Sequence, residues 1–297
     1  MSTAETSPRM VGPLQCGRFT LTLERPLVMG ILNVTVDSFS DGGSFINQGD
    51  ALRQAEKMLL EGVDLIDIGG ESTRPGALPV SAGEELARVI PLVEQLRDAN
   101  VPLSVDTYKP EVMRAALTAG ADLINDVWGF RMPGAIEAVR DSQCGVCIMH
   151  MLGEPQTMQV AEPVYRDVVA DVRGFLTERT QALTQAGVAR SRISVDPGFG
   201  FGKTVEHNYT LLAHLSQTAP QGSNGEAPLP ILAGMSRKSM LGTITGRKKP
   251  TERVAASVAA AVCAAEHGAA IIRVHDVAAT VDALKIWSAT RAAAQRS

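Results

Sequence analysis

The stretch Ser194-Val195-Asp196-Pro197-Gly198-Phe199-Gly200-Phe201-Gly202-Lys203-Thr204 joins a short apolar run to a glycine-rich loop. Residues 193–195 are typical of a buried strand, and Asp196 follows them where the chain turns. Residues 202–204 have the Gly-Lys-Thr end of a phosphate-binding loop, but Pro197 stands where that motif needs its first glycine. The alternating glycines do not fit a dinucleotide fingerprint either. We therefore interpret Asp196, at a strand's carboxyl end, as the informative residue.

The same unit recurs along the chain as an apolar strand, a polar or glycine-rich loop and an amphipathic helix. Strands are expected at residues 27–32, 65–68, 103–105, 123–124, 146–149, 193–195, 231–233 and 270–274. Helices are expected at residues 50–61, 81–98, 110–119, 134–141, 164–186, 207–215, 251–267 and 277–294. Strands that are apolar throughout indicate parallel strands buried on both faces. The pattern predicts an α/β protein with a (β/α)8 TIM barrel, and an open doubly wound sheet is the alternative.

The composition is that of an ordinary globular protein. The chain has 297 residues, of which 45% are hydrophobic and 20% charged, and single α/β barrels commonly reach this size. We expect a disordered polar tail over residues 1–13 and a single domain over residues 14–297, which opens with a β-hairpin at 14–23. Cys144 and Cys147 have redox or metal spacing, but their apolar surroundings favour buried strand cysteines.

Charge and hydropathy narrow the classes of partner. The net charge of -4 and the pI near 5.8 argue against a nucleic-acid partner. The alanine-rich run at 254–265 is too short to span a bilayer, and the polar N-terminus lacks the apolar core of a signal peptide. We therefore expect a cytoplasmic protein that binds neither nucleic acid nor membranes.

Polar residues follow each expected strand, and in a barrel these strand ends form one ring on the face where active sites lie. The ring contains Asn33, Asp67, 71–74, Asp106, Asn125, Asp126, His150, Asp196, 236–238, Arg273 and His275. Asp106, Asn125 and Asp196, with Lys238, suit the edge of a flat heterocycle, because they combine hydrogen-bond acceptors with donors. Arg273 and His275, together with Arg74, suit an anionic group such as phosphate. The long loops at 34–45 and 69–79 are predicted to be mobile lids.

Eight segments of the chain resemble the signatures of the dihydropteroate synthase family and occur in the family's order. They are Met29–Gly43, Asp67–Gly76, Ser104–Thr107, Ile124–Asp126, Met149–Met151, Asp196–Lys203, Gly234–Ser239 and Ile272–Asp276. The resemblance spans residues 14–290. Val36 stands where the family usually has proline, which predicts a less rigid first loop.

The resemblance implies an enzyme of folate biosynthesis, a transferase that is usually a homodimer. It joins 6-hydroxymethyl-7,8-dihydropterin pyrophosphate to p-aminobenzoate, requires Mg2+, and is the target of sulfonamides.

The matching positions imply three sets of site residues. Pterin would be bound by Asp106, Asn125, Met149, Asp196 and Lys238, and among these Asp106, Asp196 and Lys238 would be catalytic. The diphosphate would be bound by Asn33, Arg273 and His275, with Asn33 also the Mg2+ ligand. The p-aminobenzoate site would be framed by Thr73, Arg74, Pro75, Phe201 and Ser239.

Both the residue types at the strand ends and the family resemblance favour a dissociative substitution as the mechanism. In that mechanism the pterin CH2–O bond breaks before the amine attacks. Two other functions remain open. A methyltetrahydrofolate methyltransferase on the same barrel would share the pterin-binding set, but it has no need of the loop at 72–76 or the motif at 236–239. A catalytically inactive pterin-binding paralogue could act as a sensor, but it could lose Asn33, Arg273 and His275, which this chain retains.

Overall fold

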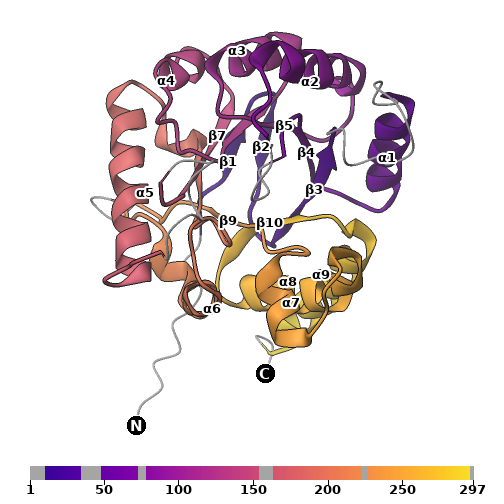
Figure 1. Cartoon of the computed structure of the whole chain (residues 1–297), viewed down its shortest axis with the longest axis vertical. Helices are drawn as coiled ribbons and strands as arrows, with labels where there is room; N and C mark the ends of the chain where they lie inside the picture. The colour runs from indigo at the N-terminus through magenta and orange to yellow at the C-terminus, as the bar shows by residue number, and fades with distance from the viewer. Residues whose placement is uncertain (1–10, 35–47, 73–77, 154–162, 223–225, 295–297) are drawn as a thin grey trace.

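The central feature of the computed structural model is a closed barrel of parallel strands (Figure 1). The structure describes residues 11–34, 48–72, 78–153, 163–222 and 226–294. The barrel strands are β3 (Leu27–Asn33), β4 (Leu65–Gly69), β5 (Leu103–Asp106), β6 (Leu123–Asp126), β7 (Gly145–Met149), β8 (Ile193–Asp196), β9 (Ile231–Ala233) and β10 (Ala269–Val274). Each strand pairs with the next along the chain, and β10 closes the ring on β3. The predicted barrel is confirmed, and the open doubly wound sheet is wrong.

Helices surround the barrel in the order that the repeating unit predicts (Figure 1). They are α1 (Gln48–Leu60), α2 (Ala82–Leu96), α3 (Pro110–Ala119), α4 (Ala135–Val139), α5 (Val168–Gln185), α6 (Val205–Ala213), α8 (Val254–Glu266) and α9 (Val277–Ala294). Among the described residues, three 3-10 turns lie between them, η2 (Arg190–Arg192), η3 (Leu215–Thr218) and η4 (Pro250–Arg253). The bounds of α3 and α9 are as predicted.

The differences from the predicted helices have local causes. α5 starts at Val168 rather than at residue 164, because the Asp167 side chain caps it by accepting the backbone N–H groups of Val169 and Ala170. α8 starts at Val254 because η4 occupies the preceding residues. A further short helix, α7 (Ser239–Thr245), was not predicted, because two turns are too short to give a clear helical period.

A hairpin covers the end of the barrel at which the strands begin. β1 (Leu14–Cys16) and β2 (Phe19–Leu21) are antiparallel and turn at Gly17, as predicted. Leu14 and Cys16 are fully buried and pack in an apolar cluster that includes the first residues of three barrel strands, Leu27, Leu65 and Leu123. This end of the barrel interior is therefore apolar and covered.

The strand register sets side chains from adjacent strands beside one another at the opposite end. Asp106 of β5 lies in register with Asn125 of β6, and Met149 of β7 with Asp196 of β8. One step deeper, Asp67 of β4 is in register with Ser104 of β5. The carboxyl end of the barrel therefore carries the polar interior that the strand-end pattern predicts.

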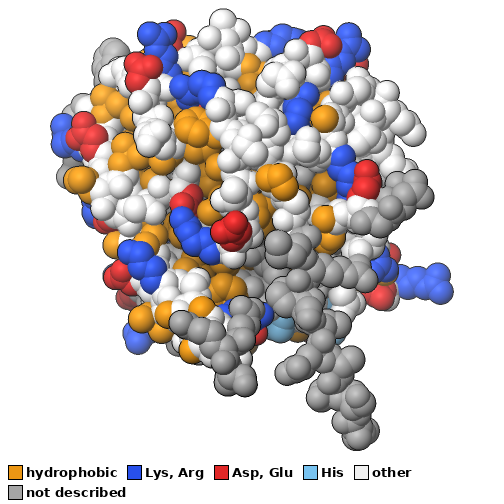
Figure 2. Space-filling view, turned by 180° about the vertical axis from the view of Figure 1, so that it is seen from behind, with side chains coloured by type: hydrophobic (Ala, Val, Ile, Leu, Met, Phe, Trp, Pro, Cys, Tyr) orange, Lys and Arg blue, Asp and Glu red, His pale blue; other side chains and the backbone are white. Residues whose placement is uncertain are grey.

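The predictions for the cysteines, the N-terminal tail and the two lids have different outcomes. Cys144 and Cys147 are both buried and unpaired, which confirms their interpretation as buried cysteines. Most of the predicted tail, and parts of both predicted lids, lie outside the described residues. Within the described ranges, no helix combines the length and the apolar character that a membrane span requires. On the face shown in Figure 2, acidic and basic side chains are interspersed with hydrophobic ones.

Candidate active site

Five side chains that the sequence assigns to one ligand lie on five neighbouring segments at the barrel mouth. Asp106, Asn125, Met149 and Asp196 stand on β5 to β8 in succession, and Lys238 follows β9. Asn125, Met149 and Asp196 are 3%, 3% and 5% exposed, so these strand ends form an interior wall rather than a solvent-facing rim. The structure therefore brings the predicted heterocycle-binding residues to one place.

Arg273 of β10 crosses this interior and holds two carboxylates. Its Nε donates to Asp67 Oδ2 at 2.6 Å, and its Nη2 donates to Asp106 Oδ2 at 2.8 Å. Burial disfavours a charged guanidinium, but the attraction of Asp67 and Asp106 outweighs it and raises the pKa of Arg273. Arg273, which the sequence assigns to an anionic group, thus also contacts Asp106, one of the predicted heterocycle-binding residues.

Asp67 is the residue that the sequence analysis placed in the ring without a role. It is fully buried and accepts hydrogen bonds from Ser104 Oγ at 2.5 Å and from Asn125 Nδ2 at 3.3 Å, besides that of Arg273. It therefore fixes the orientation of Asn125 and Arg273 from below. The sequence signal for this role was a carboxylate in the middle of an apolar strand. A charge buried there must be paired, so it indicates partners inside the barrel.

Asn125 presents an unsatisfied acceptor to the mouth. Its amide nitrogen is bound to Asp67, which orients the side chain, while its Oδ1 is buried and has no hydrogen-bond partner among the described residues. Buried polar atoms in proteins are nearly always paired, so such an atom marks a place where a ligand's N–H group would bind.

The carboxyl groups of the mouth are shifted toward their neutral forms. Burial raises the pKa of Asp106 to about 7, with the attraction of Arg273 opposing this and the repulsion of Asp67 adding to it. Burial also raises the pKa of Asp196, against the attraction of Lys238 and the hydrogen bond from the Gly198 N–H. Both groups would gain from a ligand that brings hydrogen-bond donors or positive charge.

Lys238 lies over the loop that follows β8. Its Nζ donates to Phe199 O at 2.5 Å and lies 4.7 Å from the centroid of the Phe201 ring. Burial lowers the pKa of Lys238 to about 8, although Asp196 favours its charged form. The preceding residue, Arg237, has φ of 60° and pairs with Asp276 through two hydrogen bonds, which ties the Lys238 segment to the end of β10.

The residues assigned to the anion stand near this wall. A Cβ at Gly69 would lie 3.4 Å from Asn33 Oδ1 and 3.7 Å from Asp106 Cβ, so the Asn33 amide and Asp106 flank Gly69. His275 contacts Ser236 twice, through its backbone N–H at 3.1 Å and its Nδ1 at 3.0 Å, both to Oγ. Asn33, Arg273 and His275 therefore occupy the β10–β3 side of the ring.

The predicted p-aminobenzoate residues are described only in part. Phe201 packs beside Met149 and Met151 at the mouth. Ser239 opens α7 and is exposed. Thr73, Arg74 and Pro75 lie outside the described residues, so their placement stays a prediction.

Two residues of the predicted polar ring serve the fold. Asp126 accepts the backbone N–H groups of Trp128 at 2.7 Å and Phe130 at 2.8 Å, which closes the turn after β6. Glu71 pairs with Lys109 at the start of α3. Their polar groups are satisfied within the protein.

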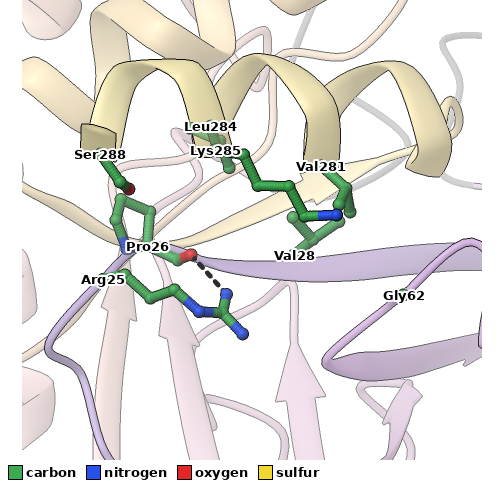
Figure 3. A pocket seen from close by; sticks show the side chains of 8 residues that line it. All are labelled: Arg25, Pro26, Val28, Gly62, Val281, Leu284, Lys285 and Ser288. Carbon is green, nitrogen blue, oxygen red and sulfur yellow. Dashed lines mark hydrogen bonds between the residues drawn. The ribbon is translucent and has the colours of Figure 1, made fainter. Parts of the chain in front are cut away.

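A hollow of about 290 Å³ lies at the side of the barrel, between the start of β3 and α9 (Figure 3). Its lining combines apolar side chains such as Val28 and Leu284 with two cations, Arg25 and Lys285. Arg25 is already bound to Asp64 at 2.6 Å and to Pro26 O. The hollow has no convergent polar groups comparable with those at the mouth, so the mouth is the candidate active site.

Comparison with known proteins identifies the family of the chain. The family model described as pterin binding enzyme matches residues 29–275. The dihydropteroate synthase of Escherichia coli strain K12 is 50% identical over 275 residues, which cover 92% of this chain and 95% of that protein. The chain belongs to the dihydropteroate synthase family.

Solved structures of dihydropteroate synthases share the whole fold. The Burkholderia cenocepacia enzyme complexed with 7,8-dihydropteroate is 69% identical with a TM-score of 0.90, and the match covers 97% of this chain and 99% of that one. The Xanthomonas albilineans enzyme with 4-aminobenzoic acid is 52% identical with a TM-score of 0.86, at 97% and 99% coverage. Family membership confirms the predicted transferase, and it does not favour the methyltransferase or the inactive paralogue.

The donor set at the mouth is compatible with the Mg2+ that dihydropteroate synthases imply. In the described part of the chain, no three His, Cys, Asp or Glu side chains gather as a metal cage. Mg2+ usually takes one or two protein oxygens and completes its shell with substrate phosphates and water. The Asn33 amide oxygen, beside Gly69 at the mouth, fits such a single protein ligand.

Proposed function

We propose that the enzyme condenses 6-hydroxymethyl-7,8-dihydropterin pyrophosphate with p-aminobenzoate to 7,8-dihydropteroate and pyrophosphate. The bond from the pterin methylene carbon to the diphosphate oxygen breaks first, and its electrons leave with pyrophosphate. The amine nitrogen then bonds to the methylene carbon and loses a proton. The observation that carries the proposal is the Asn125 Oδ1, a buried acceptor with no partner among the described residues, on a residue that lies in register with Asp106 of the neighbouring strand.

The pterin ring would lie against the wall formed by β5 to β8. Its ring N–H and amino groups would donate to Asp106, Asn125 and Asp196, and Lys238 would donate to its carbonyl or imine positions. Met149, which is buried beside them, would pack on the ring face. Satisfying the Asn125 Oδ1 removes the cost of an unpaired buried acceptor, which favours this edge-on arrangement.

Charge development supports the dissociative order. When the CH2–O bond breaks, the pterin becomes a delocalised cation. The carboxylates of Asp106 and Asp196 would stabilise this cation, and the cation would in turn stabilise their ionised forms. Burial raises the pKa of both groups, so a positive charge beside them relieves an unfavourable ionisation. The preorganised carboxylates therefore favour the transition state over the ground state, in which the pterin ring is uncharged.

The leaving diphosphate would be bound on the β10–β3 side by Arg273, His275 and Asn33. Mg2+ held by Asn33 and the diphosphate oxygens would neutralise negative charge on the leaving group. Arg273 spans from this side to Asp106 at 2.8 Å, so one guanidinium would face both the leaving anion and the pterin edge.

We further infer that p-aminobenzoate binds beside Phe201 with its carboxylate near Ser239, and that sulfonamides compete there. By the same family resemblance we infer a cytoplasmic homodimer whose partners are small molecules rather than nucleic acid or membranes. Support for the second-substrate site is the position of Phe201 next to Met149 and under Lys238.

The test is direct. Purified protein is incubated with the dihydropterin pyrophosphate, p-aminobenzoate and Mg2+, and dihydropteroate is followed by chromatography. Formation of dihydropteroate is expected; absence of product while each substrate still binds would favour the inactive paralogue. Slow release of pyrophosphate without the amine supports the dissociative order, because water then traps the cation as the alcohol. Release that depends strictly on p-aminobenzoate would contradict that order.

A further inference from the structure

The Gly-Lys-Thr segment at the end of the β8 loop has no part in the chemistry proposed above. A phosphate-binding role is excluded by its contacts. The Thr204 side chain accepts the His207 N–H at 3.1 Å and caps α6, so it serves that helix. The Lys203 ammonium points back into its own loop. What this lysine does there is therefore a separate question.

Lys203 ties the two ends of the loop to each other and to β7. Its Nζ donates to Gly198 O at 2.9 Å and to Phe201 O at 3.1 Å, and it lies 2.9 Å from His150 Nδ1. An ammonium has three hydrogens and no acceptor, so three acceptors saturate it. One of these carbonyls belongs to Phe201, the proposed wall of the p-aminobenzoate site.

His150 is built to be the third acceptor. Burial lowers the pKa of His150 to about 2, and the adjacent Lys203 charge adds to this, so the ring is neutral. Its backbone N–H donates to Asp196 O at 2.9 Å, and its ring packs edge-on against Phe175 with centroids 5.0 Å apart. The ring is thus fixed from two directions. Burial lowers the pKa of Lys203 to about 7, and Asp196 opposes that shift.

Other contacts hold individual residues of the loop. Gly200 N–H donates to Asn208 Oδ1 at 2.7 Å, and Tyr165 OH donates to Gly202 O at 2.9 Å. Gly198 has φ of 71°, and a Cβ there would lie 1.9 Å from His150 O, so the loop passes directly against the end of β7. These contacts hold single residues. The turn between Gly198 and Phe201 is closed by the Phe201 N–H, which donates to Gly198 O at 3.2 Å, and Lys203 adds a side-chain link to both of their carbonyls.

We propose that Lys203 is a positioning residue for the second substrate, acting through Phe201. Its ammonium holds the 198–202 loop so that the Phe201 ring is presented to p-aminobenzoate beneath Lys238. The inference rests on the proposed assignment of Phe201 to the p-aminobenzoate site. It concerns binding of the amine, because none of the three hydrogen-bonding partners of Lys203 is a side chain assigned to the pterin. The charge of Lys203 also favours the ionised form of Asp196, so the KM for the dihydropterin pyrophosphate is measured alongside.

The experiment compares Lys203→Met, Phe201→Ala and the double variant, with KM measured separately for both substrates. Lys203→Met is expected to raise the KM for p-aminobenzoate roughly 10-fold and to change the KM for the dihydropterin pyrophosphate by less than about 2-fold, because misplacement affects only the amine site. In the Phe201→Ala background, the lysine substitution should add almost nothing to the KM for p-aminobenzoate, since residues that act through one contact are not additive.

A matched control separates positioning from stability. Arg192 is likewise a buried cation that donates to backbone carbonyls, those of Cys144 and Val139, but at the opposite end of β8. Arg192→Met is expected to lower the Tm without changing either KM. If Lys203→Met does not fold, Lys203→Gln, which retains two N–H donors, is expected to give a smaller rise in the same KM.

The outcomes distinguish the two proposals. If Phe201→Ala leaves the KM for p-aminobenzoate unchanged, the proposed amine site is wrong, and the role of Lys203 is wrong with it. If Phe201→Ala raises that KM but the Lys203 variants only lower the Tm, as Arg192→Met does, the amine site stands and Lys203 is merely structural. Full additivity of the two substitutions would also overturn the proposal.

Discussion

The Nη2 atom of Arg273 lies 2.8 Å from Oδ2 of Asp106, although β3 and β4 separate their strands around the barrel. This ion pair links the side proposed for the leaving diphosphate to the side proposed for the pterin. It is supported from below by Asp67, which is fully buried and also binds Arg273. The charges of the mouth therefore act as one network rather than as separate binding residues.

Arg273→Ala is expected to destabilise the fold as well as the catalytic step. Removing one partner of a buried ion pair leaves uncompensated charge, which typically costs about 3–5 kcal/mol. Urea unfolding at neutral pH measures this loss. The control is Arg25→Ala, whose partner is Asp64 but whose side chain is 56% exposed, so a loss of about 1 kcal/mol or less is expected. Equal losses for the two variants would contradict the network.

The same network predicts the pH dependence of kcat/KM for the dihydropterin pyrophosphate, which reports the free enzyme. Asp106, whose pKa burial raises to about 7, must be ionised to accept N–H groups and stabilise a cation, so kcat/KM rises as the pH increases through that value. Lys238, whose pKa burial lowers to about 8, must be charged, so kcat/KM falls above it. Lys238→Arg should remove the alkaline fall. A value of kcat/KM that stays constant both below about pH 7 and above about pH 8 would be incompatible with these roles.

Asp67→Asn tests the residue that the sequence left without a role. Burial is the main reason that the pKa of Asp106 is raised, and repulsion from Asp67 adds to it. Removing the Asp67 charge should therefore move the acid limb of kcat/KM to lower pH. Asp64→Asn, at the opposite end of the barrel, should leave the limb in place. An acid limb that moves upward, or does not move, would argue against coupling between Asp67 and Asp106.

Gly234→Ala tests whether the space between Asp196 and Arg273 belongs to the pterin. A Cβ at Gly234 would lie 3.7 Å from Arg273 Cβ and 4.0 Å from Asp196 Oδ2, which are ordinary contacts that the fold tolerates. The KM for the dihydropterin pyrophosphate should rise while the Tm stays close to that of the parent protein. Gly83→Ala is the matched control, because a Cβ at Gly83 in α2 has no atom within 4 Å and should leave KM unchanged. An unchanged KM for Gly234→Ala would place the pterin elsewhere.

The barrel was predictable because strands buried on both faces are apolar throughout, and their ends are marked by the first polar residue. Asp106, Asn125 and Asp196 were found in this way, since Asp106 and Asp196 end their strands and Asn125 is the first polar residue of β6, one position before its end. The rule that active sites lie at the carboxyl ends of barrel strands then placed them together.

What could not be predicted depends on where side chains point across the barrel. Asp67 lies inside its strand, and nothing local indicates that it receives Ser104, Asn125 and Arg273. Lys203 resembles a phosphate ligand in sequence, yet its Nζ lies 2.9 Å from His150 Nδ1, which follows β7, and donates to Gly198 O, five residues earlier in the chain. Such contacts arise from tertiary structure, so the local sequence does not indicate them.

The central claim is that the Asp196 carboxylate stabilises the pterin cation. Asp196→Asn retains an oxygen that can accept the Gly198 N–H, which lies 2.7 Å from Oδ1, but it removes the negative charge. Turnover and thermal unfolding of this variant are the most direct measurement. We expect kcat to fall by about 100-fold or more, the usual effect of losing an electrostatic stabiliser, while the Tm is nearly unchanged. Near-normal turnover by a folded Asp196→Asn variant would contradict it.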